Sequence, residues 1–377
     1  MPSNPTEAAT TMSESKSLNA CVPVNKLSAE ILDEIFELVI LSWDPKDFHR
    51  RDVMGNHWQR RDLMLVSKAW HQRILFNPKL WAQVFLNAGP LYSDDDLKNV
   101  YGILGRNLEK SGQRMRTLHL SSPGMVDVEN AKSCGARDVL TIDPMISLPG
   151  LADFILSISN WQEVYIDLKD YPDFASKIFD TNSKPGNTWR SLQTLILESE
   201  YPPDEDGEGS HAEVGKVRMT RANFPALRNV SLNIPCCYLN VWSLPWAQLR
   251  TLSLKDLFAE TSDYLTILGD CAALEVLEVE YYPTDSDWTP NKQALITRVP
   301  RLRIVSIGGS GKNTTRLLLD QLNLPSLHSF TFSGNAEETA FRTSFLKLLK
   351  RSSVQPSTVR LEITEGSLKG MSTAFLE

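Results

Sequence analysis

The sequence predicts an α/β protein in which a small module of three helices precedes a solenoid of short parallel strands alternating with helices. Two observations support this fold class. Between residues 27 and 85, apolar residues recur at helical spacing. After Pro90, a six-residue pattern with apolar residues at its first, fourth and sixth positions recurs at intervals of 22 to 35 residues.

The length of the chain fits this division, because 377 residues exceed what one compact core usually serves. The first twenty residues are rich in Ser, Thr, Ala, Asn and Glu and contain no apolar core, so we predict a disordered tail rather than a signal peptide. The predicted domains are therefore a tail at residues 1–20, a helical module at 21–86 and a solenoid at 87–377.

The first helix is predicted to start after Ser28, whose side chain is placed to cap the free amides of the first turn. Residues 42–61 are polar, contain Pro and Gly, and predict a loop. A second helix is predicted from Asp62 to Asn77-Pro78, with apolar positions spaced for one face. A short third helix is predicted to contain Leu80, Trp81, Val84 and Phe85.

The helical module carries more apolar residues than a core of this size can bury, which indicates a partner surface. Residues 27–36, 62–70 and 77–81 resemble the F-box in order and character. This resemblance implies binding to the Skp-type adaptor of a cullin-based ubiquitin ligase. The residues that it implies for adaptor binding are Leu27, Ile31, Leu32, Ile35, Phe36, Leu65, Val66, Trp70, Leu80 and Trp81.

Some of these residues must be internal core, and the sequence does not divide the two groups. The alternative is that all of them pack the helical module onto the rest of the chain. In an adaptor interface, the apolar anchors would supply most of the binding energy.

The repeat pattern is recognised at ten places. Its middle positions are Leu118, Leu140, Val164, Leu195, Val230, Leu252, Leu277, Val305, Phe330 and Leu361. Each strand is predicted to turn alternate apolar side chains inward, while its neighbours cover the surface that it cannot bury alone. The pattern resembles the irregular leucine-rich repeats of F-box proteins, which implies that this part of the chain holds a protein target. Ordinary strands of an α/β domain are the alternative.

Two segments are candidates for a target-binding surface. One is an acidic insertion that includes Asp204, Glu205 and Asp206, which is either a solvated loop or a contact for a basic partner. The other has the aromatic residues Tyr281, Tyr282 and Trp288 just after a strand. Those aromatic side chains suit an interface hot spot, and equally suit packing of the following segment.

Residues 308–314 contain three glycines and Lys312 after a strand and invite a phosphate-loop interpretation. That motif requires Gly-x-x-x-x-Gly-Lys-Ser/Thr, and Ser306 and Asn313 stand where its first Gly and its hydroxyl residue would be. A tight glycine turn between strand and helix is the preferred explanation. No catalytic, metal-binding or cofactor-binding site is predicted.

The net charge of −7 gives no support for a nucleic-acid partner, and no apolar run is long enough to cross a membrane. Five cysteines without regular spacing fit a reducing compartment, so a cytoplasmic or nuclear location is expected.

The favoured hypothesis is a non-enzymatic substrate receptor that links a protein target, through the Skp-type adaptor, to a cullin. A non-catalytic interaction scaffold without a ligase role is the alternative. An NTP-dependent enzyme that uses residues 308–314 is a remote third hypothesis.

Overall fold

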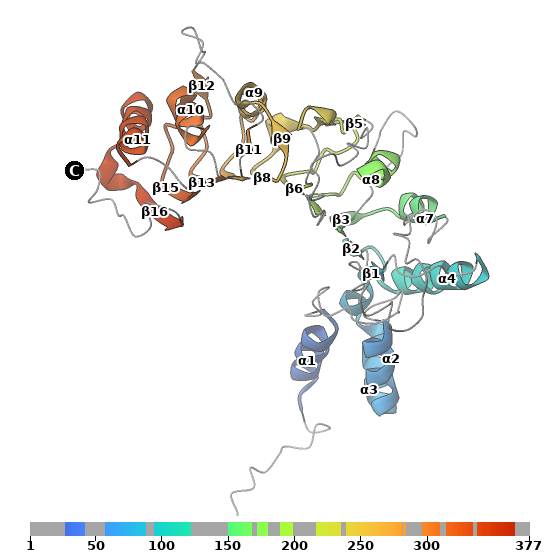
Figure 1. Ribbon diagram of the computed structural model, residues 1–377. Helices are drawn as coiled ribbons and strands as arrows, with labels where there is room; N and C mark the ends of the chain where they lie inside the picture. Colours follow the sequence, from blue (N-terminus) through green and yellow to red (C-terminus); the bar gives the residue numbers. More distant parts are fainter. Residues whose placement is uncertain are drawn as a thin grey trace, which may run out of the picture.

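The structure is a computed structural model. It describes residues 27–41, 57–87, 94–121, 150–167, 172–179, 189–198, 216–234, 239–280, 282–283, 296–309, 314–334 and 338–365. The described elements form an arc, with the strands of a long sheet on its inner side and helices on its outer side (Figure 1). The predicted α/β class is confirmed, with a large parallel sheet and helices.

Within the described ranges, the main sheet has ten strands that follow chain order, and every neighbouring pair is parallel. The strands are β1 (Gln83–Asn87), β2 (Arg116–Ser121), β3 (Trp161–Asp167), β4 (Thr194–Glu198), β6 (Asn229–Asn233), β8 (Thr251–Lys255), β10 (Val276–Glu280), β13 (Ile304–Gly309), β15 (Ser329–Gly334) and β16 (Arg360–Glu365). Three further pairs of two-residue strands lie in the connections: β5 (Val217–Arg218) with β7 (Trp242–Ser243), β9 (Phe258–Ala259) with β11 (Tyr282–Pro283), and β12 (Thr297–Arg298) with β14 (Leu322–Asn323).

The connections also contain the outer helices. The α-helices are α4 (Asp94–Lys110), α7 (Leu151–Ser157), α8 (Pro172–Phe179), α9 (Thr261–Asp270), α10 (Thr314–Gln321) and α11 (Glu338–Ser352). The 3-10 turns among them are η4 (Leu239–Val241), η5 (Trp246–Gln248) and η6 (Pro356–Thr358). No helix in the described part of the chain is long and apolar enough to cross a bilayer.

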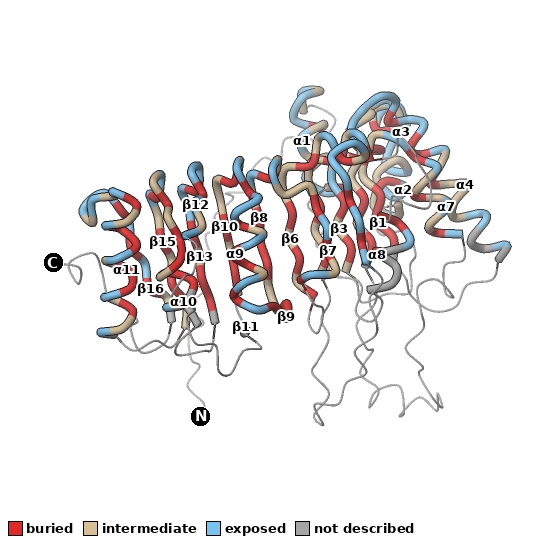
Figure 2. The backbone as a smooth tube through the Cα atoms, turned by 90° about the horizontal axis from the view of Figure 1, so that it is seen from above, coloured by how far each residue is buried: buried red, intermediate tan, exposed pale blue. Residues whose placement is uncertain are grey.

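The sheet forms because alternate residues of each strand are apolar and buried. In β4, Leu195 and Leu197 are buried while the residues beside them are partly exposed. Figure 2 shows buried residues in the strands of the sheet and in the helices outside it. Their side chains belong to one core cluster. At the carboxyl end, for example, the ring of Phe330 on β15 lies 4.8 Å from that of Phe345 on α11.

Nine of the ten predicted repeat positions fall on strands of this sheet, and Leu140 lies outside the described residues. The remaining strand is β1, although the apolar spacing there predicted part of a third helix. That assignment was wrong: a 3-10 turn, η3 (Pro78–Trp81), ends at Trp81, and Val84 and Phe85 belong to β1. Val84 and Leu86 both lie in the core of the sheet, and their separation by two residues is the period expected for a strand. Consequently β1 lies across the predicted domain boundary at residue 86.

The helical module differs from the prediction in two further places. Its helices are α1 (Ala29–Leu41), α2 (His57–Val66) and α3 (Lys68–Phe76). Helix α2 begins at His57, so the last five residues of the predicted 42–61 loop are helical; residues 42–56 lie outside the described part.

The predicted second helix is two helices, because the chain is extended at Ser67 and the Ser67 hydroxyl accepts a hydrogen bond from the Trp70 amide at 3.1 Å. A residue that caps a new helix interrupts the old one, even though the apolar spacing continues across it.

The module and the sheet meet at Trp81, which is only 2% exposed. Its indole Nε1 donates a hydrogen bond to the Ile74 carbonyl at 2.8 Å. The guanidinium of Arg60 lies 5.1 Å from the ring centroid, and Nζ of Lys110 on α4 lies 3.9 Å from it. Arg60 is itself buried, donates to the Leu80 carbonyl at 2.9 Å, and has its pKa lowered to about 10 by burial. Trp81 therefore joins α2, α3 and α4.

Replacing Trp81 by Ala is expected to lower the free energy of unfolding by about 3–5 kcal/mol, because it opens a cavity beneath a buried Arg and removes a buried hydrogen bond. Urea denaturation followed by circular dichroism measures the change. Phe76→Ala is the matched control: Phe76 is 77% exposed, so a change of less than about 0.5 kcal/mol is expected. Equal losses in both variants would contradict the role assigned to Trp81.

Candidate functional site

Helix α1 carries apolar residues on its exposed surface as well as on the side that packs in the core. Leu32, Phe36 and Ile40 are its buried residues and face the core of the module. At about 100° per residue, Ile31 and Leu38 fall within about 20° of one another on a different side of the helix. Both side chains are exposed, whereas Leu27, just before the helix, is partly buried against the core. The helix therefore presents apolar side chains to the outside as well as to its core.

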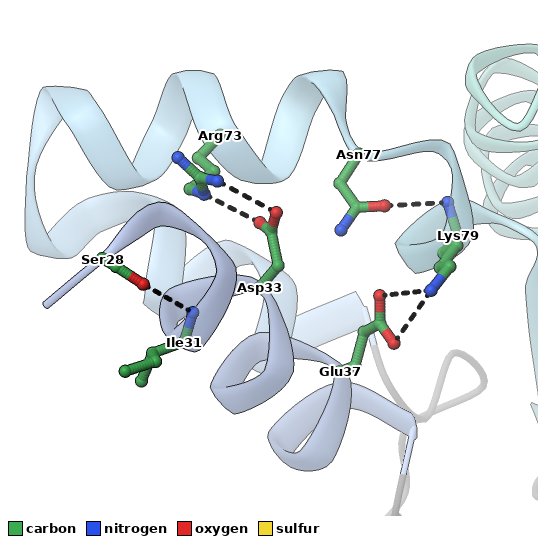
Figure 3. Close-up of polar contacts among 7 residues, drawn as sticks. All are labelled: Ser28, Ile31, Asp33, Glu37, Arg73, Asn77 and Lys79. Atoms are coloured by element: carbon green, nitrogen blue, oxygen red, sulfur yellow. Dashed lines mark hydrogen bonds and ion pairs between the residues drawn. The ribbon is translucent and has the colours of Figure 1, made fainter.

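The acidic side of α1 holds the helix against α3 and η3. Both carboxylate oxygens of Asp33 accept hydrogen bonds from Arg73, at 2.8 and 3.0 Å. Glu37 pairs with Lys79 at 3.1 Å. Figure 3 shows Ile31 pointing away from these contacts. Since the ion pairs set the rotation of α1 about its axis, they also determine which apolar residues stay outside.

The exposed apolar residues of the module come from all three of its α-helices. They are Ile31, Leu38, Val39, Leu65, Val66 and Phe76, with exposed fractions between 45% and 77%. Leu65 and Val66 lie at the end of α2, directly before the Ser67 break, while Phe76 ends α3. Exposed apolar side chains in this number, on a module whose described residues include six in the buried core, are typical of a surface that a partner covers.

The structure divides the ten residues implied for adaptor binding. Leu32, Phe36, Leu80 and Trp81 are buried in the module, and Ile31, Leu65 and Val66 are exposed. Leu27, Ile35 and Trp70 are partly buried, and the ring of Trp70 lies edge-on to that of Phe36 at 4.9 Å.

Sequence reasoning did not select Leu38, Val39 and Phe76. The first two continue the stripe of Ile31 and Ile35 by a further turn, so the spacing contained that signal.

The residues proposed from sequence for a target-binding surface lie largely beyond the described part. Asp204, Glu205, Asp206, Tyr281 and Trp288 are outside it. The backbone of Tyr282 belongs to β11, which pairs with β9.

Two of the three glycines in the phosphate-loop-like segment, Gly308 and Gly309, belong to β13, so the predicted glycine turn does not include them. Residues 310–313, where the rest of that turn would lie, are outside the described part of the chain. Gly308 pairs with Glu280 on one side and Ser333 on the other, and its φ is outside the left-handed region. A Cβ atom at Gly308 would lie 3.1 Å from Cγ of Glu280. Glycine is needed there for space rather than for conformation, and the acidic side chain over it disfavours a phosphate. Lys312 lies outside the described residues.

The inner side of the sheet displays the residues that alternate with the buried ones, and strand register places them in rows. One row begins with Phe85, His119 and Tyr165 on β1 to β3. The rings of Phe85 and His119 stack at 4.5 Å, and Tyr165 lies 5.6 Å from His119. The Tyr165 hydroxyl donates a 2.7 Å hydrogen bond to Glu198. Aromatic stacking thus stiffens the end of the sheet nearest the helical module.

Chemical sites of other kinds find little support in the described residues. No group of three or more His, Cys, Asp or Glu side chains there is arranged to hold a metal ion. Cys271 is a free thiol, and burial raises its pKa to about 12, which makes it a packing residue rather than a nucleophile. The sequence matches no model of a known protein family, and no curated protein is significantly similar to it.

His119 is expected to make stability depend on pH. Burial lowers its pKa from 6.5 to about 4, so between these values the unfolded chain binds more protons than the folded one. Stability therefore falls as the pH drops through this window, by up to about 3 kcal/mol. Since Nδ1 of His119 makes no hydrogen bond with a described residue, His119→Phe is expected to remove this part of the acid sensitivity while keeping the ring stack.

Urea denaturation at neutral pH and at about pH 4.5 measures this effect. His328→Phe, at an exposed histidine, is the matched control and should leave the difference between the two pH values unchanged. An unchanged difference in His119→Phe would show that His119 is not responsible.

Proposed function

We propose that this chain is the substrate-recognition subunit of a cullin-based ubiquitin ligase. In this proposal the helical module is an F-box that binds a Skp-type adaptor, and the strands and helices after it are an irregular leucine-rich-repeat solenoid that binds a protein target. The chain itself carries out no chemistry. It raises the rate of ubiquitin transfer by holding the target close to the charged enzyme at the far end of the assembly.

The observation that carries the proposal is the exposed apolar surface of the module, formed by Ile31, Leu38, Val39, Leu65, Val66 and Phe76. A surface of this kind costs solubility when it is free and gives binding energy when it is covered. The residues beneath it are held by a small core and by the Asp33–Arg73 and Glu37–Lys79 pairs, so the surface exists before a partner arrives. A preformed apolar surface binds with a small entropic cost.

The proposed division of labour also follows from the shape of the chain. The module sits at one end of the sheet, and the rest of the inner side extends away from it (Figure 1). A partner on the helices and a second partner on the strands would therefore contact different parts of the molecule. The buried Trp81 joint between α3 and α4 would keep the two partners at a constant distance.

The adaptor-binding surface is tested by Ile31→Asp combined with Val66→Asp. We expect this variant to lose both the adaptor and the cullin in an affinity capture from cells, because it places two charges in an apolar interface. Leu32 and Trp81 are unsuitable for the test, since both are buried and their replacement would destabilise the module itself. Ile304→Asp is the matched control: Ile304 is exposed on β13, outside the module, so that variant should retain both partners.

Circular dichroism of each purified variant checks that the fold is intact. Capture of the adaptor by the folded double variant would contradict docking through this surface. Capture of the adaptor without the cullin, by the unmodified chain, would favour a scaffold that takes no part in a ligase.

A further inference from the structure

Acidic side chains gather around a single lysine in the middle of the inner sheet face. Nζ of Lys255 on β8 lies 2.8 Å from a carboxylate oxygen of Glu278 on the neighbouring strand β10. The other oxygen of Glu278 accepts a hydrogen bond from Ser253 at 3.1 Å. Through Asn233, strand register places Glu198 of β4 in the row of Lys255. Glu280 follows Val279, the partner of Leu254, and so lies beside Lys255.

The electrostatics of Lys255 show that this surface favours a cation. The hydrogen bond with Glu278 raises the pKa of Lys255, and the charges of Glu278, Glu280 and Glu198 act in the same direction. Since three carboxylates surround one ammonium group, the net charge of this cluster is −2. These groups are partly exposed: the side chain of Lys255 is 29% exposed and that of Glu278 is 45% exposed. An additional cation can therefore reach them from outside.

The positions around the carboxylates are occupied by small residues. Gly308 is buried under Glu280, whose Cγ lies 3.1 Å from where a Cβ would be, so this glycine gives Glu280 the space to lie across β13. In the adjacent row, register aligns Ser231, Ser253 and Ser306 on either side of Glu278. Small residues beside the carboxylates let a partner's backbone come close to the sheet.

The spacing of the carboxylates distinguishes a polypeptide from a metal ion. Glu198 and Glu280 are on strands three steps apart in the sheet, which is about 14 Å at about 4.8 Å per step. An extended chain covers that distance in about four residues. A single metal ion needs its ligands within about 2.6 Å, and the described residues form no such group.

We propose that the inner face around Glu198, Lys255, Glu278 and Glu280 binds an extended basic segment of a protein partner, with Lys or Arg side chains about four residues apart. Lys255 already pairs with Glu278, so it competes with the partner's cations for that carboxylate. This inference rests on the proposed function, in which the sheet holds the protein target, and it assigns that target a basic recognition segment.

The test uses the full chain and a short fluorescein-labelled peptide with Arg at every fourth position and Ser elsewhere, followed by fluorescence anisotropy. Glu278→Gln with Glu280→Gln is expected to weaken binding about tenfold, because two charge-assisted contacts are lost. Asp95→Asn with Glu109→Gln changes the net charge equally on the outer helix α4, and should leave the affinity within about twofold. Lys255→Gln is expected to tighten binding, since it removes the competing cation.

Equal weakening by the two double variants would overturn the proposal, because binding would then follow net charge alone. Unchanged or weaker binding by Lys255→Gln would also overturn it, as would stronger binding of a peptide with Glu in place of Arg. Thermal unfolding of each variant confirms that the sheet is intact. The affinity capture of the adaptor tests only the surface of the helical module. A chain that captures the adaptor and the cullin but does not bind the Arg peptide would therefore refute this inference and leave the proposed function intact.

Discussion

The structure depends on the burial of paired apolar side chains that lie in register from strand to strand. Leu252 and Leu254 of β8 stand beside Val230 and Leu232 of β6, and the pattern continues in both directions along the sheet. Each buried side chain contributes about 1.5–3 kcal/mol, but only while its neighbours cover it. No strand is stable alone, so stability is shared along the array and the ends of the sheet need covering. At the carboxyl end, α11 packs its phenylalanine rings against β15.

At the amino end, the sheet is continued by the helical module, and Trp81 makes that connection. Burying Arg60 beside it costs desolvation energy, which the hydrogen bond to the Leu80 carbonyl and the contact with the indole ring offset. Because the chain passes from η3 into β1 without a flexible linker, the orientation of the helices follows from the first strand of the sheet. The module is therefore a rigid extension of the sheet rather than a separate body on a tether.

Sequence reasoning succeeded where one periodicity acted alone and was wrong where two competed. The first helix and nine strand positions follow from uninterrupted patterns of apolar residues. At Ser67 the helical spacing of Val66, Trp70 and Ile74 continues, yet the cap formed by the Ser67 hydroxyl divides the helix. The predicted third helix rested on four apolar residues, Leu80, Trp81, Val84 and Phe85. Four residues are too few to distinguish the period of a strand from that of a helix, and the pairing of Val84 and Phe85 with β2 makes this segment a strand. The division of the module's apolar residues into core and surface depends on the rotation of α1 about its axis. Contacts with Arg73 and Lys79 fix this rotation, and both residues lie about forty positions further along the chain, so helical spacing alone could not predict it.

The period of two that buries the leucines also determines where the binding chemistry can lie. In Val276–Glu280, Leu277 and Val279 are required by the core, which leaves the alternate positions free to carry Glu278 and Glu280. In the sequence these glutamates occupy variable positions of a repeat, so the sequence indicated the acidic insertion and the aromatic residues after the strand as binding candidates instead. Strand register reveals the acidic cluster, because it brings Glu198, Lys255 and Glu280 together from strands far apart in the chain. Gly308 fits the same explanation: it gives Glu280 the space to lie across β13, so the glycine that resembles part of a nucleotide motif instead positions a carboxylate on the inner face.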